Sequence, residues 1–294
     1  MGLGRAALDP RGRFADIGGR RMHWVEAGPP KSTAPLIVFE AGSFGFSADW
    51  AVVQERLAAR GLRSIAYDRA GLGLSDRGPS PRDGLAIAED LEKLLAAIGE
   101  GGPFILVGHS MAGLHVHLFA GRNPRQVAGL VLVDAIDPEG ATHPMVRRYA
   151  VHFGRLSHLA AGAASLGLFK PLTAALGDRI ELTEEAAPQK RWAFAHGPHN
   201  RAASEEVQHW EAAARQARQA GALDPAWPVA VVTAGSVRGF AWSKAIQARP
   251  AQASRHGHVA NVATASHANL LGRRHADAIV DGILHVCQAL TKAA

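Results

Sequence analysis

Cysteine is almost absent from this chain, which has a single one, Cys287, among its 294 residues. One cysteine excludes a disulfide framework and any zinc site built from cysteine ligands. A chain with no disulfide to maintain fits a reducing compartment. We therefore expect an intracellular, cytoplasmic protein.

Long apolar runs are also missing. No stretch approaches the roughly 18 consecutive apolar residues that a membrane-spanning helix requires. The first 19 residues contain arginines but no apolar core of a signal peptide. The sequence therefore predicts a soluble protein without a membrane span.

The net charge of +6 comes without a basic stripe. Arginines are scattered singly or in pairs, such as Arg20–Arg21 and Arg147–Arg148, and no aromatic residues alternate with them. This pattern predicts a solvated arginine-rich surface and no nucleic-acid partner. The sequence also lacks a Gly-rich phosphate loop, an H-E-x-x-H motif and a ligand-spaced His/Asp cluster, so we expect no cofactor and no metal.

Short β-branched apolar runs alternate with helical patterns along most of the chain. Strands are predicted at 22–28, 36–42, 63–68, 104–109, 129–134, 229–235 and 258–265, and helices at 49–61, 83–99, 111–124 and about 274–292. This alternation indicates βαβ units and an α/β fold with a mostly parallel sheet. The hydrophobic content of 47% is enough for a full core.

The alternation stops between residues 138 and 227, where the pattern is helical and the clearest helix is 204–223. The segment is short for an independent domain, and the strands after it must still complete the first sheet. We therefore predict a core of residues 1–137 and 228–294 with a helical cap inserted at 138–227.

A serine lies where a buried strand turns into a helix, in the stretch FILVGHSMAGLHVHLF at 104–119. Such a turn lifts the Ser110 hydroxyl clear of the sheet and needs small neighbours, here Gly108 and Ala112. Gly113 is expected to keep the helix close to the strand. The helix N-terminus directs N–H groups to the place where an oxyanion forms, so Ser110 is predicted to be a nucleophile. The alternative is a serine that only caps the helix.

The segment VGHSMAG resembles the nucleophile elbow of the α/β-hydrolase fold family, although Ala112 replaces the second glycine of G-x-S-x-G. The resemblance covers essentially the whole chain, including the segments EAGSFGFSADW, YDRAGLGLSD and GLVLVDAIDP. It implies a central sheet flanked by helices, with a cap. It also implies an oxyanion hole formed by the backbone N–H groups of Ser43 and Met111, although Ala41 replaces the usual histidine of that loop.

The base is chosen among fifteen histidines by position. His267 follows the last predicted strand, where the family presents its base to the elbow. The other histidines have less suitable places: His256 and His258 before that strand, His275 and His285 on the last helix, His109 in the turn, and His115 and His117 along the buried helix.

In much of the family the acid follows the penultimate strand, but this place is empty here, because no Asp or Glu occurs from Pro225 to Ala276. Some branches of the family take the acid from the end of the strand after the nucleophile helix, where Asp134 stands. Asp137 is a second candidate, although it precedes Pro138 and fits a turn. A weakened or absent acid is the third possibility. Glu40, beside the oxyanion loop, fits a structural hydrogen bond or a polarising carboxylate.

These features predict a cofactor-independent serine hydrolase that cleaves an ester-like bond of a small apolar substrate through an acyl-enzyme. A C–C bond hydrolase, an acyltransferase or an amidase could use the same triad, and a ligand-sensing protein could use the same pocket with little turnover. A serine nucleophile argues against a haloalkane dehalogenase or an epoxide hydrolase, which form an alkyl-ester intermediate.

Replacing the candidate nucleophile is the first test. Ser110→Ala should fold normally and lose esterase activity by several orders of magnitude, because only the oxyanion hole and substrate binding remain. The measurement is hydrolysis of a p-nitrophenyl ester together with labelling by a serine-directed probe. Labelling retained in the variant would exclude Ser110 as the nucleophile.

Overall fold

The computed structural model describes residues 12–32, 34–169, 179–238 and 241–293 of the chain. Its centre is an eight-stranded sheet in the order β1-β2-β4-β3-β5-β6-β7-β8. The strands are β1 Gly12–Asp16, β2 Arg21–Ala27, β3 Leu36–Glu40, β4 Ser64–Tyr67, β5 Phe104–His109, β6 Val127–Val133, β7 Val229–Ala234 and β8 Gly257–Val262. β2 pairs antiparallel with β1 and β4, and all other pairs are parallel. The predicted α/β fold is confirmed.

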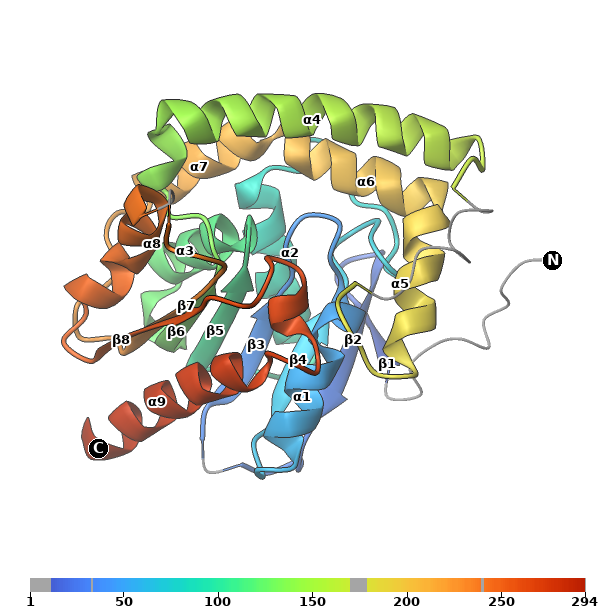
Figure 1. Cartoon of the computed structure of the whole chain (residues 1–294). Coiled ribbons are helices and arrows are strands. Elements are labelled where there is room, and N and C mark those ends of the chain that lie inside the picture. The colour runs from blue at the N-terminus through green and yellow to red at the C-terminus, as the bar shows by residue number, and fades with distance from the viewer. Residues whose placement is uncertain (1–11, 33, 170–178, 239–240, 294) are drawn as a thin grey trace.

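Helices cover both faces of the sheet (Figure 1). They are α1 Ala51–Ala58, α2 Gly84–Ala97, α3 Ala112–Arg122, α4 Pro144–Ser165, α5 Ala186–Ala195, α6 Gly197–Gln208, α7 Trp210–Gln219, α8 Ala241–Ala253 and α9 Asp277–Ala293. Short 3-10 turns are η2 Ser47–Trp50, η3 Pro124–Gln126, η4 Gly140–Thr142 and η5 Asn269–Leu271. One core cluster joins α1 and α9 to the sheet and another joins α2 and α3 to its other face. β3, β5, β6 and β7 are buried throughout, as parallel strands covered on both faces should be.

The described residues between β6 and β7 form helices and turns but no strand. α4 crosses the top of the molecule in Figure 1, over α6 and α7. α7 packs through Trp210 and Ala213 against Leu114 and Leu118 of α3, within one apolar cluster. The helical segment therefore lies at the same end of the sheet as the turn between β5 and α3.

Several elements differ from the predictions. β1 was not predicted, because only Ala15 of this edge strand is buried and the apolar alternation is correspondingly weak. α8 was not predicted either, since it has few buried apolar residues and contains Pro250. The helix predicted at 204–223 is two helices, α6 and α7, which meet at His209.

A buried ion-pair network joins the helical segment to the sheet. The Arg69 guanidinium, 2% exposed, donates to Glu40 at 2.5 Å and to Glu206 of α6 at 2.8 Å. It also donates to the carbonyl oxygens of Ala41 and Gly42. Burial alone would lower the pKa of Arg69. The carboxylates of Glu206 and Glu40 outweigh burial and raise that pKa above its usual value. Two carboxylates thus hold the guanidinium against the loop after β3.

Within the described ranges, none of the helices has the length and the apolar composition needed to cross a membrane.

The Arg69 network generates a stability prediction. Glu206→Ala should lower the free energy of unfolding by about 3 kcal/mol, the lower end of the range for a broken buried pair, because Glu40 still compensates Arg69. Glu205→Ala is the matched control: its partners are Arg77, which is 71% exposed, and the exposed Ser80 hydroxyl, so the loss should stay below about 1 kcal/mol. Urea denaturation measures both, and equal losses would contradict a special role for Glu206.

Candidate active site

Ser110 lies between β5 and α3 in a left-handed backbone conformation, with φ at 59°. This conformation costs a non-glycine residue about 1–3 kcal/mol, so the surroundings must hold it. The Ser110 N–H donates to Val133 O at 3.1 Å, and its carbonyl accepts from Gly113 N at 3.1 Å and Ile136 N at 2.9 Å. The end of β6 and the turn after it therefore fix the elbow predicted from the sequence.

Glycines allow the backbone to approach Ser110 closely. A Cβ on Gly108 would lie 2.9 Å from Ala112 O, and one on Gly42 would lie 2.8 Å from the Ser110 Cβ. A Cβ on Gly113 would lie 2.5 Å from Ile136 O. Gly113 was expected to bring the helix close to the strand, and what it approaches is the turn directly after β6.

The loop after β3 lies beside the elbow. Ser43 Oγ is 3.6 Å from Met111 Sδ, so the two candidate oxyanion residues are neighbours. Arg69 binds the carbonyls of Ala41 and Gly42 and so holds the loop's peptide groups in place. Within the described residues, the backbone N–H groups of Ser43 and Met111 have no hydrogen-bond partner. Backbone N–H groups without a partner can donate hydrogen bonds to a developing oxyanion.

Asp134 and His267 are brought together. His267 Nδ1 donates to Asp134 Oδ2 at 2.6 Å, which leaves Nε2 as the ring's proton acceptor. Asp134 Oδ1 accepts from Ala234 N, Lys244 Nζ and Gln247 Nε2 at 3.2–3.3 Å. Burial alone would raise the pKa of Asp134, but the hydrogen bond from His267 and the nearby Lys244 charge outweigh it and lower that pKa well below its usual range. Asp134 is therefore ionised at neutral pH.

Asp137 is turned away from His267 and accepts from Gly140 N at 2.8 Å. Burial raises the pKa of Asp137. Its contacts are those of a turn residue, in agreement with the alternative role considered for it. Glu40 forms hydrogen bonds with Tyr67 and Arg69, and Arg69 outweighs the effect of burial and lowers the Glu40 pKa. Glu40 therefore has the contacts of a structural carboxylate.

His109 has a role that the sequence analysis missed. Its ring lies 4.5 Å from the His267 ring, and its Nε2 donates to the His267 carbonyl at 3.1 Å. Burial, with the neighbouring His267, lowers the His109 pKa to about 3, so the ring is neutral. His109 thus supports the loop that carries the candidate base. The signal in the sequence was its position next to Ser110.

The remaining histidines lie elsewhere. His258 stacks on His285 and His285 donates to the His256 carbonyl at 3.1 Å, at the start of β8. His275 was expected on the last helix but precedes it, because α9 begins at Asp277. Lys244 and Gln247 were not identified from the sequence because α8 was not predicted. The carboxylate-free stretch was the signal that could have directed attention there.

A cavity of about 300 Å³ is lined by the three residues that follow Asp134, which are Ala135, Ile136 and Asp137. Gln247, which donates to Asp134, forms part of its wall, and so does Ile136, whose N–H donates to Ser110 O. The other lining residues are largely apolar: Ala135, Met145, Val146, Tyr149, Trp242 and Ile246 among them. No group of three or more His, Cys, Asp or Glu side chains suited to a metal ion occurs in the described part of the chain.

Comparison with known proteins agrees with this architecture. The model of the alpha/beta hydrolase fold matches residues 35–236. An AB hydrolase superfamily protein of Gibberella zeae is 37% identical over 114 residues, which cover 37% of this chain and 35% of that protein. The sn-1-specific diacylglycerol lipase ABHD11 of Mus musculus is 37% identical over 112 residues, 38% of this chain and 36% of the lipase. The chain thus spans about a third of the length of these curated relatives.

Solved structures resemble the whole chain. The haloalkane dehalogenase DbeA of Bradyrhizobium elkani superposes with a TM-score of 0.73 at 20% identity, covering 96% of this chain and 99% of the dehalogenase. At this level of identity the likeness concerns the fold.

The contacts of the two aspartates generate the next prediction. Asp134→Asn should lower kcat by roughly 10⁴, because the amide favours the His267 tautomer that cannot accept the serine proton. Asp137→Asn should cost less than about tenfold, a barrier change below about 1.4 kcal/mol. Steady-state kinetics on one soluble ester compares them. Equal and mild losses would mean that neither aspartate orients His267.

Proposed function

The chain belongs to the alpha/beta hydrolase fold family, and on that premise we propose that it is a cofactor-independent serine hydrolase acting on ester-like bonds. The observation that carries the proposal is the strained Ser110 elbow at the same sheet edge as the 2.6 Å His267–Asp134 hydrogen bond. Strained backbone conformations are concentrated at functional sites, where the surrounding structure holds them. A serine that only caps a helix would not require a left-handed backbone.

In the proposed reaction, the Ser110 hydroxyl attacks the ester carbonyl carbon while His267 Nε2 takes its proton. The resulting oxyanion accepts hydrogen bonds from the N–H groups of Ser43 and Met111. The tetrahedral intermediate then expels the alcohol, which receives the proton from His267. Water, activated by the same imidazole, hydrolyses the acyl-enzyme and regenerates Ser110. Asp134 keeps the imidazole in the required tautomer throughout.

The substrate is proposed to be a small molecule with an apolar acyl or alcohol group. The cavity beside Asp134 supports this, because its volume of about 300 Å³ and its mainly apolar wall fit such a group. Residues 138–227 are proposed to act as a cap that selects the substrate. Support comes from Val146 and Tyr149 of α4, which line the cavity together with Ile136 of the core.

The chemistry of a serine nucleophile favours acyl transfer over the reactions named for the structural neighbours. Haloalkane and epoxide substrates need a carboxylate nucleophile that forms a hydrolysable alkyl ester, and a serine would form a stable ether. C–C bond hydrolysis, acyl transfer to another acceptor and amide hydrolysis share the proposed acyl-enzyme and are separated by substrate panels. A ligand sensor would have the same site with little turnover.

Labelling and turnover measured together test the proposal. A fluorophosphonate probe should label the chain, and p-nitrophenyl esters of increasing acyl length should be hydrolysed over many turnovers. His267→Ala should abolish turnover, while His258→Ala, remote from the elbow, should stay near the unmodified protein. Labelling without repeated turnover would favour the sensor, and loss of activity in His258→Ala would contradict the choice of base.

A further inference from the structure

Five large apolar side chains on or directly after α4 are mainly exposed, whereas Val146 and Phe153 of the same helix pack against the apolar cluster beneath it. Met145, Tyr149, Leu156, Leu159 and Leu166, which follows the helix directly, are 59–79% exposed. Their spacings of three, four and seven residues place them along one stripe, which we call the outer stripe. The buried positions of α4 carry only small residues: Ala150, Ser157, Ala161 and Ala164. The face of α4 that carries the outer stripe is therefore apolar and exposed.

The surroundings of the outer stripe are basic. Residues 140–169 contain Arg147, Arg148 and Arg155 but no Asp or Glu. Arg148 and Arg155 directly precede Tyr149 and Leu156, and within the described residues neither forms an ion pair. Arg147 reaches Glu211 of α7 at 3.3 Å, but both side chains are largely exposed. Two of the three arginines beside the stripe, Arg148 and Arg155, thus have no ion-pair partner among the residues that the structure describes.

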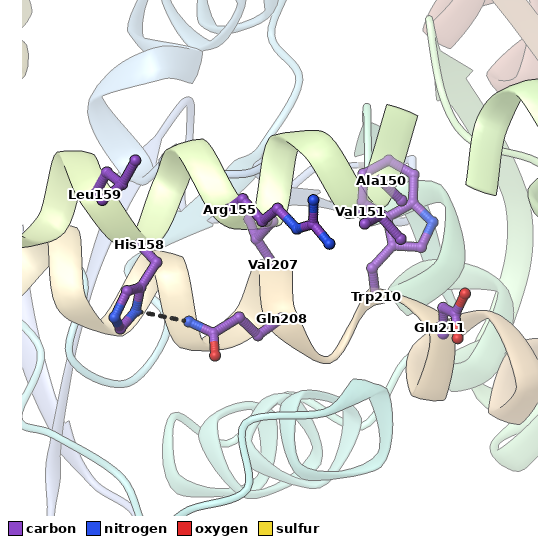
Figure 2. A pocket seen from close by; sticks show the side chains of 10 residues that line it. Ala150, Val151, Arg155, His158, Leu159, Val207, Gln208, Trp210 and Glu211 are labelled. Atoms are coloured by element: carbon purple, nitrogen blue, oxygen red, sulfur yellow. Dashed lines mark hydrogen bonds between the residues drawn. The ribbon is translucent and has the colours of Figure 1, made fainter. Parts of the chain in front are cut away.

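A groove runs along the stripe between α4 and the helices α6 and α7. Its volume is about 720 Å³. Figure 2 shows Arg155, His158 and Leu159 of α4 beside Val207 and Gln208 of α6. The groove therefore combines apolar walls with the Arg155 guanidinium at one part and the Glu211 carboxylate at another.

We propose that the outer stripe docks on the surface of an anionic lipid bilayer. An amphipathic helix with apolar residues on one face and arginines beside them binds at the boundary between head groups and acyl chains. The leucines would enter that boundary while Arg148 and Arg155 pair with lipid phosphates. A second copy of the chain fits less well, because a two-fold contact through α4 brings the arginines of both copies into one interface, and α4 itself supplies no carboxylate.

Docking in this orientation keeps the sheet away from the membrane, because α4 is the outermost layer over α6 and α7 (Figure 1). Met145 and Tyr149 of the outer stripe also line the cavity formed by the residues that follow Asp134, whereas Leu156 and Leu159 do not. Variants of these two leucines therefore test the docking without changing the proposed substrate cavity.

Co-sedimentation of the full chain with vesicles tests the docking. The protein should bind vesicles of equal parts phosphatidylcholine and phosphatidylglycerol, bind phosphatidylcholine alone far more weakly, and dissociate as salt is raised. Arg148→Gln with Arg155→Gln should weaken binding by about twentyfold, from roughly fivefold for each arginine near an anionic surface. Leu156→Ser with Leu159→Ser should weaken it by at least about tenfold.

Matched controls lie on other faces. Val259→Ser on β8, at a residue 49% exposed, and Arg125→Gln on η3 should leave binding unchanged. Circular dichroism checks that each variant is folded. Absence of binding, equal binding to the two vesicle types, or binding insensitive to both double variants would overturn the proposal. A dimer in sedimentation velocity that the leucine variants dissociate would assign the stripe to a second copy and would also overturn it.

Discussion

The left-handed backbone at Ser110 is the constraint on which the rest of the site depends. Without it, β5 would run into α3 with the serine side chain among the strand and helix contacts. Hydrogen bonds from Gly113 and Ile136, and one to Val133, hold this conformation. They tie the elbow to the end of β6, which is also where Asp134 stands. One strained turn therefore brings Ser110 and Asp134 to the same edge of the sheet.

The proposed acid, Asp134, directly follows β6. The stretch after β7, where the resemblance to the family leads one to expect the acid, contains no carboxylate. Asp134 has its own left-handed backbone, with φ at 40°, and its carboxylate accepts from Ala234 at the end of β7 and from Lys244 and Gln247 of α8. The Asp134 side chain therefore lies beside the end of β7, although the residue itself follows the neighbouring strand β6. His267 is held by this carboxylate and, through its carbonyl, by His109.

The parts of the site that follow from local patterns could be predicted from the sequence. Ser110, Asp134 and His267 stand at or after strand ends that apolar runs identify, and small residues mark the elbow. Lys244 and Gln247 could not be found, because Pro250 and a weak apolar pattern obscure α8. The Arg69–Glu206 pair joins residues 137 positions apart, and no periodicity connects residues at that distance. From the sequence alone, the exposed leucines of α4 cannot be distinguished from core residues. Only the packing shows which face of the helix is buried.

Covalent capture of the acyl-enzyme tests whether Ser110 is the nucleophile. The protein is mixed with a p-nitrophenyl ester, quenched in acid within the first turnovers, digested, and its peptides are weighed by mass spectrometry. If Ser110 is the nucleophile, we expect a single acyl group on the peptide that contains Ser110, formed at the rate of the first p-nitrophenol release. Turnover without an adduct on Ser110, or with the acyl group on another residue, would contradict it.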